Sequence, residues 1–491
     1  MLKPYWSGDQ SRRIVARIVA EGELVLQTPA HFGNGDGDDQ TDMPLLLDPL
    51  DGRSPLLTGA SIAGALRSYL RAKERGDRQP LPQRGDKNAE DEERNSAVVK
   101  IFGGFKGDDE GEQSPLIVND SLGRDFGIEM RDGVSICPES RTAEEDKLYN
   151  LQLWQAGTTF PLRFELLLRD GDDAPKLKQA LAATLAGFDG GITLGARKRR
   201  GYGRVSVAQW RVRTYDLMNV SDLCDWIERG DEPLPNTYAV ADLKSSLGDP
   251  TAFGDKRRVF TMQANFSLDG SLLIRSGGGQ DDRGPDMIHL RSKQANGSEQ
   301  PTLSGTSLGG ALRARALKIA NTLGPAKAQS VIEEIFGLTD KASRVSVGEE
   351  VVQNATTNLM QNRVSIDRFT GGARDTALFN QQPAFGGGDT LVTVDVQLSN
   401  PKDYEIGLLL LLLKDLWTGD LALGGESSVG RGRLKGKSAT LTYRNGGTPQ
   451  TWTISANGGG LSVKDQNGAD ARAPLSSFVT ALKAELAGDK R

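Results

Sequence analysis

Residues 194–205 read Leu-Gly-Ala-Arg-Lys-Arg-Arg-Gly-Tyr-Gly-Arg-Val and combine three glycines with five basic side chains. Glycine lets backbone N–H groups approach an anion closely, and the basic side chains supply positive charge. Residues 423–434 read Leu-Gly-Gly-Glu-Ser-Ser-Val-Gly-Arg-Gly-Arg-Leu. Aligned without a gap, the two stretches share a Gly-x-Gly-Arg end, which pairs Gly201, Gly203 and Arg204 with Gly430, Gly432 and Arg433. The match indicates a duplicated fold, and the basic composition indicates that its loops bind phosphate.

The segments that precede these two loops also repeat. Each half begins with a run typical of a strand, at Arg13–Leu26 and Val259–Ile274, followed by a Gly/Asp-rich loop. Pro55–Arg67 and Pro301–Arg313 then share the helix start Pro-x-x-x-Gly-x-Ser-x-x-Gly-Ala-Leu-Arg. Shorter matches keep the same order, namely Ile101–Gly103 with Ile335–Gly337, Val134–Ile136 with Val364–Ile366, and Leu148–Asn150 with Leu378–Asn380. Such ordered matches indicate an internal duplication.

The duplication predicts two domains, 1–235 and 257–491, with a linker at 236–256 where proline and glycine break the periodicity. A length of 491 residues is comfortable for two domains. Each half is interpreted as strand, loop, helix, several strands, helix, Gly-rich turn and strand, with the second helices near 174–187 and 404–417. This order is α+β and is compatible with a ferredoxin-like (RRM-like) βαββαβ unit that carries insertions.

Composition excludes several classes of protein. The two cysteines are too few for a disulfide framework or a Cys-based zinc site, which favours a reducing cytoplasm. The longest apolar run, the leucines of 408–413, is far shorter than the ~20 residues that span a bilayer, so we expect a buried helix and no membrane partner. The formal net charge of −5 argues against bulk electrostatic binding of nucleic acid and places any such binding in local basic patches.

Taken in order, these motifs resemble the RAMP superfamily of CRISPR-associated proteins, and more narrowly the backbone subunits of type III effector complexes. The motifs are the Gly-rich loop, Asp-x-Pro-x-x-x-Asp-Pro at 42–49, the shared helix start, Ile-Phe-Gly and the Gly-x-Gly-Arg turn. The resemblance covers nearly the whole chain, twice, and a tandem fusion of two backbone units is similar to type III-D-like variant systems. It implies a ferredoxin-like palm with a projecting β-hairpin thumb in each half.

The resemblance also implies an activity and partners. Guide RNA would lie along the two palms, and the paired target RNA would be cleaved beside each thumb, in a complex with a polymerase-like large subunit and further backbone units. The cutting residue would be an aspartate in the loop after the first strand, which is Asp42 in the first half and Asp286 in the second. The second loop lacks the proline that follows Asp42 by two positions. Competing acids in the same loops are Asp36, Asp38, Asp39, Asp281 and Asp282.

Cleavage of RNA by its own 2′-OH needs little from the protein. A carboxylate can act as base, as a ligand of Mg²⁺, or as the group that holds a displaced nucleotide in line. Mg²⁺ is therefore the expected cofactor if a metal takes part, and the sequence assigns no metal ligands. Two alternatives remain open: a scaffold that binds guide RNA without cutting, and a guide-processing RAMP endoribonuclease. The second is disfavoured because the two histidines, His31 and His289, do not align.

Two kinds of segment are predicted to bind guide phosphates. Each shared helix start offers free N–H groups, with Ser61 or Ser307 at its beginning and Arg67 or Arg313 further along, and ordinary helix capping is the alternative. The loops would grip phosphates without reading sequence, and the contact in the second half would be weaker or repositioned because Glu-Ser-Ser-Val replaces Arg-Lys-Arg-Arg. The predicted loop residues are Arg197, Lys198, Arg199, Arg200, Gly201, Gly203, Arg204, Gly430, Arg431, Gly432 and Arg433.

Thumb hairpins are predicted within 137–149 and 367–385. Apolar side chains on such hairpins can wedge between bases, and a place in the hydrophobic core is the alternative. The candidate wedge residues are Leu148, Tyr149, Leu378 and Phe379.

Overall fold

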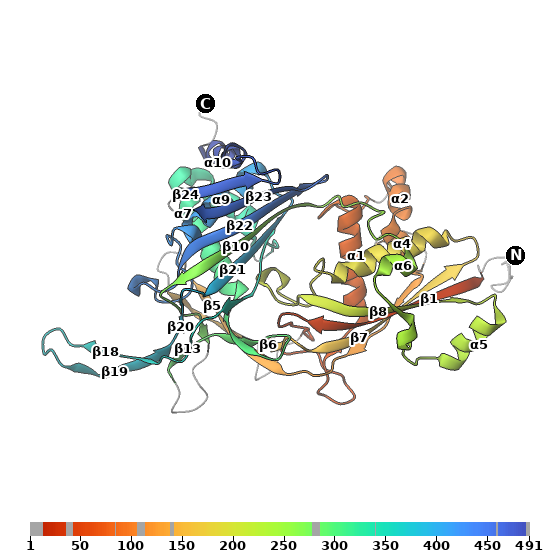
Figure 1. Ribbon diagram of the computed structural model, residues 1–491, viewed down its shortest axis with the longest axis horizontal. Helices are drawn as coiled ribbons and strands as arrows, with labels where there is room; N and C mark the ends of the chain where they lie inside the picture. The colour runs from red at the N-terminus through yellow and green to blue at the C-terminus, as the bar shows by residue number, and fades with distance from the viewer. Residues whose placement is uncertain are drawn as a thin grey trace.

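The predicted α+β class is confirmed: in this computed structural model the chain forms two α+β halves that lie side by side (Figure 1). The structure describes residues 13–35, 43–83, 85–105, 113–137, 142–276, 285–338, 340–457 and 460–487. The two large hydrophobic cores do not mix, since one is built from residues 18–247 and the other from residues 260–486. No helix among the described residues is long and apolar enough to cross a bilayer.

The first half is built on an antiparallel sheet. Its central strand, β1 (Ile14–Leu26), is rich in β-branched residues and pairs with β7 (Thr159–Arg169) on one side and β8 (Val205–Asp216) on the other. β3 (Leu116–Val118) follows β7 at one edge. The helices α1 (Gly59–Arg75) and α4 (Ala174–Leu185) supply apolar side chains to the core beneath the sheet. The smaller helices are α2 (Lys87–Arg94), α3 (Ala97–Phe102) and α5 (Val220–Arg229).

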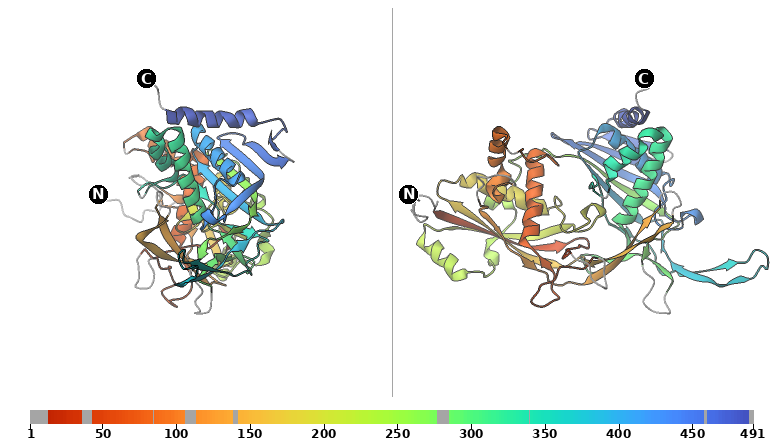
Figure 2. Two further views of the ribbon diagram at one scale, coloured as in Figure 1. Left: turned by 90° about the vertical axis from the view of Figure 1, so that its left-hand side faces the viewer. Right: turned by 180° about the vertical axis from the view of Figure 1, so that it is seen from behind.

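The second half repeats this order. β10 (Arg258–Asp269) is central and pairs with β21 (Leu391–Ser399) and β22 (Arg433–Asn445), and β16 (Val345–Val347) pairs with β21 as β3 pairs with β7. The run of leucines lies in α9 (Asp403–Trp417), which is buried against α10 (Arg472–Ala487) as predicted for a helix that is apolar nearly all round. Further strands and helices of this half are β14 (Arg291–Lys293), β15 (Glu299–Leu303), β17 (Glu350–Gln353), β23 (Gln450–Asn457), β24 (Gly460–Asp465), α7 (Gly305–Leu323) and α8 (Pro325–Phe336). Figure 2 shows α7 and α8 on the helical face of this sheet.

The predicted linker carries structure of its own. β9 (Ala239–Val240) extends the first sheet beside β8, and α6 (Leu243–Leu247) buries Leu243 and Leu247 in the first core. Most of segment 236–256 therefore packs on the first half.

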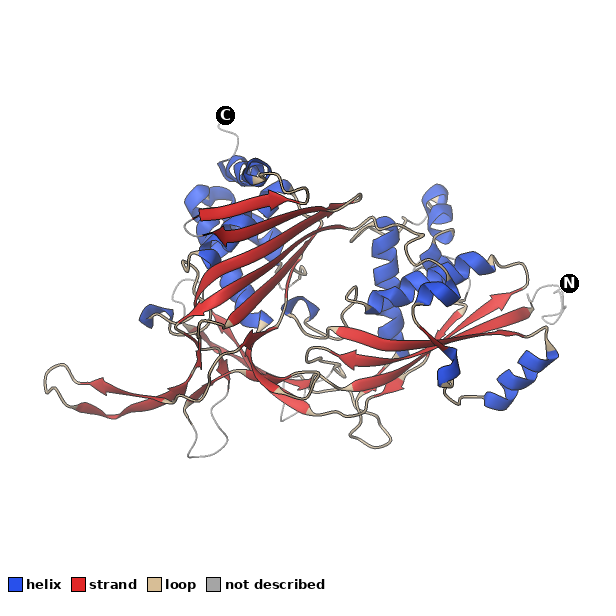
Figure 3. Cartoon of the chain, in the orientation of Figure 1, coloured by secondary structure: helices blue, strands red, loops and turns tan. Residues whose placement is uncertain are grey.

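A two-stranded hairpin leaves each half. β5 (Ile128–Ile136) pairs with β6 (Ala143–Trp154), and β18 (Gln361–Ile366) pairs with β19 (Ala373–Gln382). The predicted thumb range 137–149 contains part of β6, and 367–385 contains all of β19, but neither range contains the first strand of its hairpin. The first hairpin runs along the second half, whereas β18 and β19 project beyond it (Figure 3).

A buried ion pair joins the first hairpin to the second half. Nη2 and Nη1 of Arg131 in β5 lie 3.0 and 3.3 Å from the carboxylate oxygens of Glu349, and 6% and 3% of the two side chains are exposed. Glu129 also accepts a hydrogen bond from Arg131 and one from Ser292 of β14. Nearby, Arg204 Nη1 lies 2.9 Å from a carboxylate oxygen of Glu350. Charged groups taken out of water in this way hold the two halves in one relative position.

We expect Arg131→Met to lower the free energy of unfolding by about 3–5 kcal/mol, because it leaves the buried Glu349 carboxylate uncompensated. Burial raises the pKa of Glu349, and the Arg131 guanidinium counteracts this. Without Arg131 the folded state therefore binds the proton more tightly than the unfolded state, and the loss shrinks as the pH falls toward 5. Urea unfolding at pH 8 and pH 5 measures both effects.

The double variant Arg131→Met/Glu349→Met removes both charges and should recover most of the loss. Arg472→Gln, on an exposed arginine paired with Asp470, is the matched control. A loss at pH 8 no larger than that of the control would contradict the role of the pair.

Candidate nucleic-acid interface

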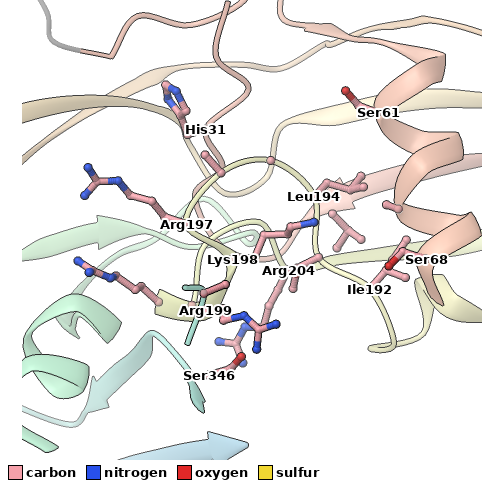
Figure 4. Close-up of a pocket in the computed structure, with 18 of the residues that line it drawn as sticks. His31, Ser61, Ser68, Ile192, Leu194, Arg197, Lys198, Arg199, Arg204 and Ser346 are labelled. Carbon is pink, nitrogen blue, oxygen red and sulfur yellow. The ribbon is translucent and has the colours of Figure 1, made fainter. Parts of the chain in front are cut away.

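A cleft of about 2170 Å³ lies between the two halves. The first half contributes one face of α1, through Ser61, Gly64 and Ser68, together with the basic loop, and the second half contributes β16 and β21 (Figure 4). The described residues of its lining include eight arginines and lysines against three aspartates. The cleft is therefore positively charged although the chain as a whole is acidic.

The predicted basic loop supplies most of this charge. All five basic residues of the loop line the cleft, namely Arg197, Lys198, Arg199, Arg200 and Arg204. Burial lowers the pKa of Lys198, and the neighbouring Arg199 lowers it further. Burial likewise lowers the pKa of Arg199, with a further contribution from Arg78. Cations crowded into a partly dry cleft are stabilised by a bound anion, so this surface favours a phosphate backbone.

The glycines at the loop ends have a structural reason that the sequence did not distinguish from anion binding. Gly203 and Gly432 have φ of 71° and 74°, and a Cβ at either would lie 1.9 Å from the carbonyl oxygen of Leu194 or Leu423. Only glycine permits this closure. The same argument places Gly201, with φ of 87°, against the second half, since its Cβ would lie 2.3 Å from the backbone nitrogen of Glu349.

The two helix starts are capped from within the protein. Thr58 and Ser304 accept hydrogen bonds from the N–H groups of Ser61 and Ser307, as the capping alternative predicted. The N–H of Gly59 also donates to the carboxylate of Asp120 at 2.6 Å, so α1 already holds an anionic group at its N-terminus. Ser61 lines the cleft through its side of α1.

The two arginines of the shared helix motif have different surroundings. Arg67 donates to the carbonyl oxygens of Gly103 and Gly104, at 3.4 and 2.8 Å, and lines a separate, smaller pocket. Arg313 is exposed and lines the main cleft. A phosphate contact is therefore supported by position for Arg313, whereas Arg67 is engaged in holding the segment after α3.

The second loop uses its arginines differently. Arg431 is buried, with 3% of its side chain exposed, and its Nε lies 2.9 Å from a carboxylate oxygen of Glu426. Its Nη2 donates to Gln361 and Gln381. Arg431 is thus used inside its own half, in contrast to the predicted grip on guide RNA, while Arg433 is exposed at the start of β22.

The hairpins present apolar side chains to solvent. Leu148 and Leu378 are 72% and 70% exposed, and they lie opposite Val134 and Val364, which are also exposed. A place in the core, the alternative for these leucines, is wrong. Tyr149 instead lies beneath the guanidinium of Arg197, 4.3 Å from the ring centroid, and Phe379 is partly buried.

The predicted cutting residues differ in what the structure describes. Asp42 lies outside the described residues. The same is true of the competing acids Asp36, Asp38, Asp39, Asp281 and Asp282. Asp286 is exposed at the root of the second hairpin, where its carboxylate accepts the N–H of Asn380 at 2.8 Å and its own N–H donates to the Asn380 side chain at 2.6 Å. Within the described part of the chain no three His, Cys, Asp or Glu side chains gather as a metal site would require, so no metal ligand is assigned there.

Both histidines are buried. His31 Nδ1 lies 2.8 Å from the carbonyl oxygen of Gln152, and burial, with a contribution from Arg197, lowers its pKa. His289 Nδ1 accepts the N–H of Ile274 at 3.1 Å, and burial lowers its pKa to about 4. Neither is placed as an accessible general acid or base, in line with the sequence argument against a histidine-driven nuclease.

Several cleft residues escaped sequence reasoning because they come from the other half. Four residues of the second half face the first basic loop across the cleft, namely Lys341, Ser346, Asp395 and Gln397. The acidic pair that follows β16, Glu349 and Glu350, was the one available signal, since it complements the charge of that loop.

Comparison with known families agrees with the repeat. A family model described as the RAMP superfamily matches residues 23–206 and 265–435. Each match runs from the first strand of a half to the end of its Gly-rich loop, and together they cover more than half of the chain. No curated protein matches the chain.

The pKa of His289 predicts acid sensitivity. The unfolded chain protonates this histidine near pH 6.5, whereas the folded chain protonates it near pH 4, so stability is lost as the pH falls from 6.5 through 4. Above pH 6.5, neutral His289 contributes about 3 kcal/mol to the free energy of unfolding through this difference in pKa. Urea unfolding at pH 7 and pH 4.5 should show a smaller loss for His289→Asn than for the parent chain. Equal losses would show that His289 does not titrate in this range.

Proposed function

The chain belongs to the RAMP superfamily, whose members have a CRISPR-associated RNA-binding role, and from this premise we propose that it is a backbone subunit of a type III effector complex. In this proposal its two halves are palms that bind guide RNA, and loop aspartates cleave the paired target RNA beside each hairpin. The further partners are a polymerase-like large subunit and other backbone units, and the tandem arrangement corresponds to a type III-D-like variant.

The strand order supports the ferredoxin-like palm. In the first half the order is β3-β7-β1-β8, and in the second it is β16-β21-β10-β22. Counted along the chain, both read second, third, first, fourth, with one helical segment after the first strand and another after the third. This is the arrangement of a βαββαβ unit whose two βαβ crossovers interleave.

The observation that carries the proposal is the basic cleft between the palms. An RNA backbone has one negative charge per nucleotide, and a lining of eight cations among the described residues matches it without reading base sequence. Small side chains along α1, such as Gly64 and Ser68, leave the backbone of the helix open to close approach. The cleft is partly open to solvent rather than enclosed, as a strand of RNA requires.

We expect the double variant Lys198→Gln/Arg199→Gln to weaken binding of a guide RNA by the full chain. Loss of two phosphate contacts should reduce the slope of log affinity against log salt by about 1.4. Titration of the RNA at several salt concentrations measures the slope. The matched control, Arg472→Gln/Lys483→Gln, makes the same change in net charge on α10, away from the cleft. An unchanged slope in the first variant would show that the cleft does not hold the RNA.

The position of the hairpins supports the proposed cleavage. Exposed apolar residues such as Leu148 and Leu378 can enter the base stack and displace a nucleotide. The released backbone can then place the 2′-OH in line with its phosphate, and an adjacent carboxylate can hold that geometry or accept the proton. Asp286 lies at the root of the second hairpin, and its hydrogen bonds to Asn380 fix it there.

In the assembled complex, Asp42→Ala and Asp286→Ala should each remove one cut in the target RNA, by at least about 10²-fold, and leave the other cut unchanged. Mapping the 5′ ends of the products measures both cuts in one experiment. Asp389→Ala, on an exposed aspartate of the Gly-Gly-Gly-Asp turn, is the matched control. Survival of both cuts in the double variant would identify the chain as a scaffold.

A further inference from the structure

The two loops that follow the palms carry opposite charges at one equivalent position. Arg197 in the first loop matches Glu426 in the second. Both residues have a left-handed backbone, with φ of 52° and 60°. This conformation is unfavourable for a non-glycine residue, and such strain persists where the surroundings require it. Both halves therefore keep a strained residue at this position although its charge is inverted.

In the first half the strained residue reaches the root of the hairpin as a cation. The Arg197 guanidinium lies over the Tyr149 ring of β6 and donates to its hydroxyl. It also lies 3.4 Å from the sulfur of Met43, the residue that follows Asp42. The Tyr149 ring fits because the residue opposite it on β5 is Gly133, where a Cβ would lie 2.2 Å from the ring.

In the second half the same place is occupied by a different set of residues. Gly133 is replaced by Arg363 on β18, opposite Phe379, which has no hydroxyl. Arg363 Nη1 donates to the carboxylate of Glu426 at 3.1 Å, and Gln381 and Arg431 also donate to that carboxylate. In the second half the cation therefore comes from the hairpin, as Arg363. The strained loop residue, Glu426, is the anion that binds it.

The two guanidiniums of the second root differ in exposure. Arg431 is 3% exposed and is enclosed between Glu426 and the glutamines, whereas Arg363 is 31% exposed. Arg363 is therefore the guanidinium of this cluster that an RNA strand can reach.

The exposed guanidinium belongs to a strand that pairs with one edge of β19, and the loop aspartate is hydrogen-bonded to the other edge. Asp286 is hydrogen-bonded to Asn380 of β19, and Arg363 faces the adjacent residue of β19, Phe379. Met287, which follows Asp286, lies 3.6 Å from Gln381 of the cluster, as Met43 contacts Arg197 in the first half. The methionine that follows the candidate cutting residue therefore contacts the hairpin root in each half, at the guanidinium of Arg197 in the first half and at the amide of Gln381 in the second.

We propose that Arg363 is the counterpart of Arg197, and that each guanidinium binds a phosphate of the target RNA at the root of its hairpin. Glu426 positions Arg363 there, as Tyr149 positions Arg197. This inference rests on the proposed cleavage of target RNA beside the hairpins. A guanidinium matches a phosphate with two parallel N–H donors, which fixes the strand as well as neutralising it. The sequence alone predicts only a weaker or repositioned contact in the second half.

The test uses the assembled complex and the two cuts as internal controls for each other. Arg197→Gln should reduce the cut at the first site about tenfold or more and leave the second unchanged, and Arg363→Gln should do the reverse. Arg363→Lys, which keeps a cation, should retain more of the second cut than Arg363→Gln. Glu426→Gln should weaken the second cut by a smaller factor, because it releases Arg363 without removing it. Arg472→Gln serves as the remote control.

A second readout separates phosphate binding from a merely structural role. Arg363→Gln should lower the salt dependence of target-RNA binding by about 0.7–0.9 in log–log slope, the value for one phosphate contact. An unchanged slope, or equal loss of both cuts, would overturn the assignment of Arg363. If Asp286→Ala also leaves the second cut intact, the cleavage proposal fails. If Asp286→Ala removes that cut and Arg363→Gln does not weaken it, only this inference fails.

Discussion

The contact between Arg131 and Glu349 determines how the two halves of the chain meet. The two groups come from a hairpin of one half and a loop of the other, and neither retains contact with water beyond a few per cent of its surface. Removing such charges from water costs several kcal/mol each, and the cost is offset only when donors and acceptors face one another closely. A slide of one half along the other would separate them. The cleft between the halves therefore has a defined width and a defined set of facing residues.

The loop at 194–205 serves both sides of this arrangement. Gly201 and Arg204 pack against the second half, while Lys198 and Arg199 line the cleft. Because one loop makes both kinds of contact, the packing of the two halves also sets the positions of Lys198 and Arg199. A substitution that disrupts the interface therefore also disturbs the candidate RNA surface. The second loop has no second half to pack against within this chain. Its Arg431 turns inward to Glu426 and the hairpin instead.

Local sequence patterns predict the main helices and strands but do not predict the contacts between them. β1, α1, α4 and α9 follow from alternation, capping residues and apolar runs, all of which act over a few neighbouring residues. Arg131 and Glu349 are 218 positions apart, and no local pattern links them. The shared helix motif likewise could not separate Arg67, whose partners are carbonyl groups, from Arg313, which faces the cleft. The role of each of these arginines depends on the groups that face its side chain in the folded structure.

The hairpin roots show the same limit in a sharper form. An alignment of the two loops pairs Arg197 with Glu426, which indicates a weaker or repositioned phosphate contact. The fold adds the residue that faces this position across the hairpin, and there Gly133 has become Arg363. An isolated carboxylate at this root would repel phosphate, and an isolated Arg363 would be free to turn into solvent. Together they hold a guanidinium at the root of the second hairpin, so the two substitutions are understood only as a pair.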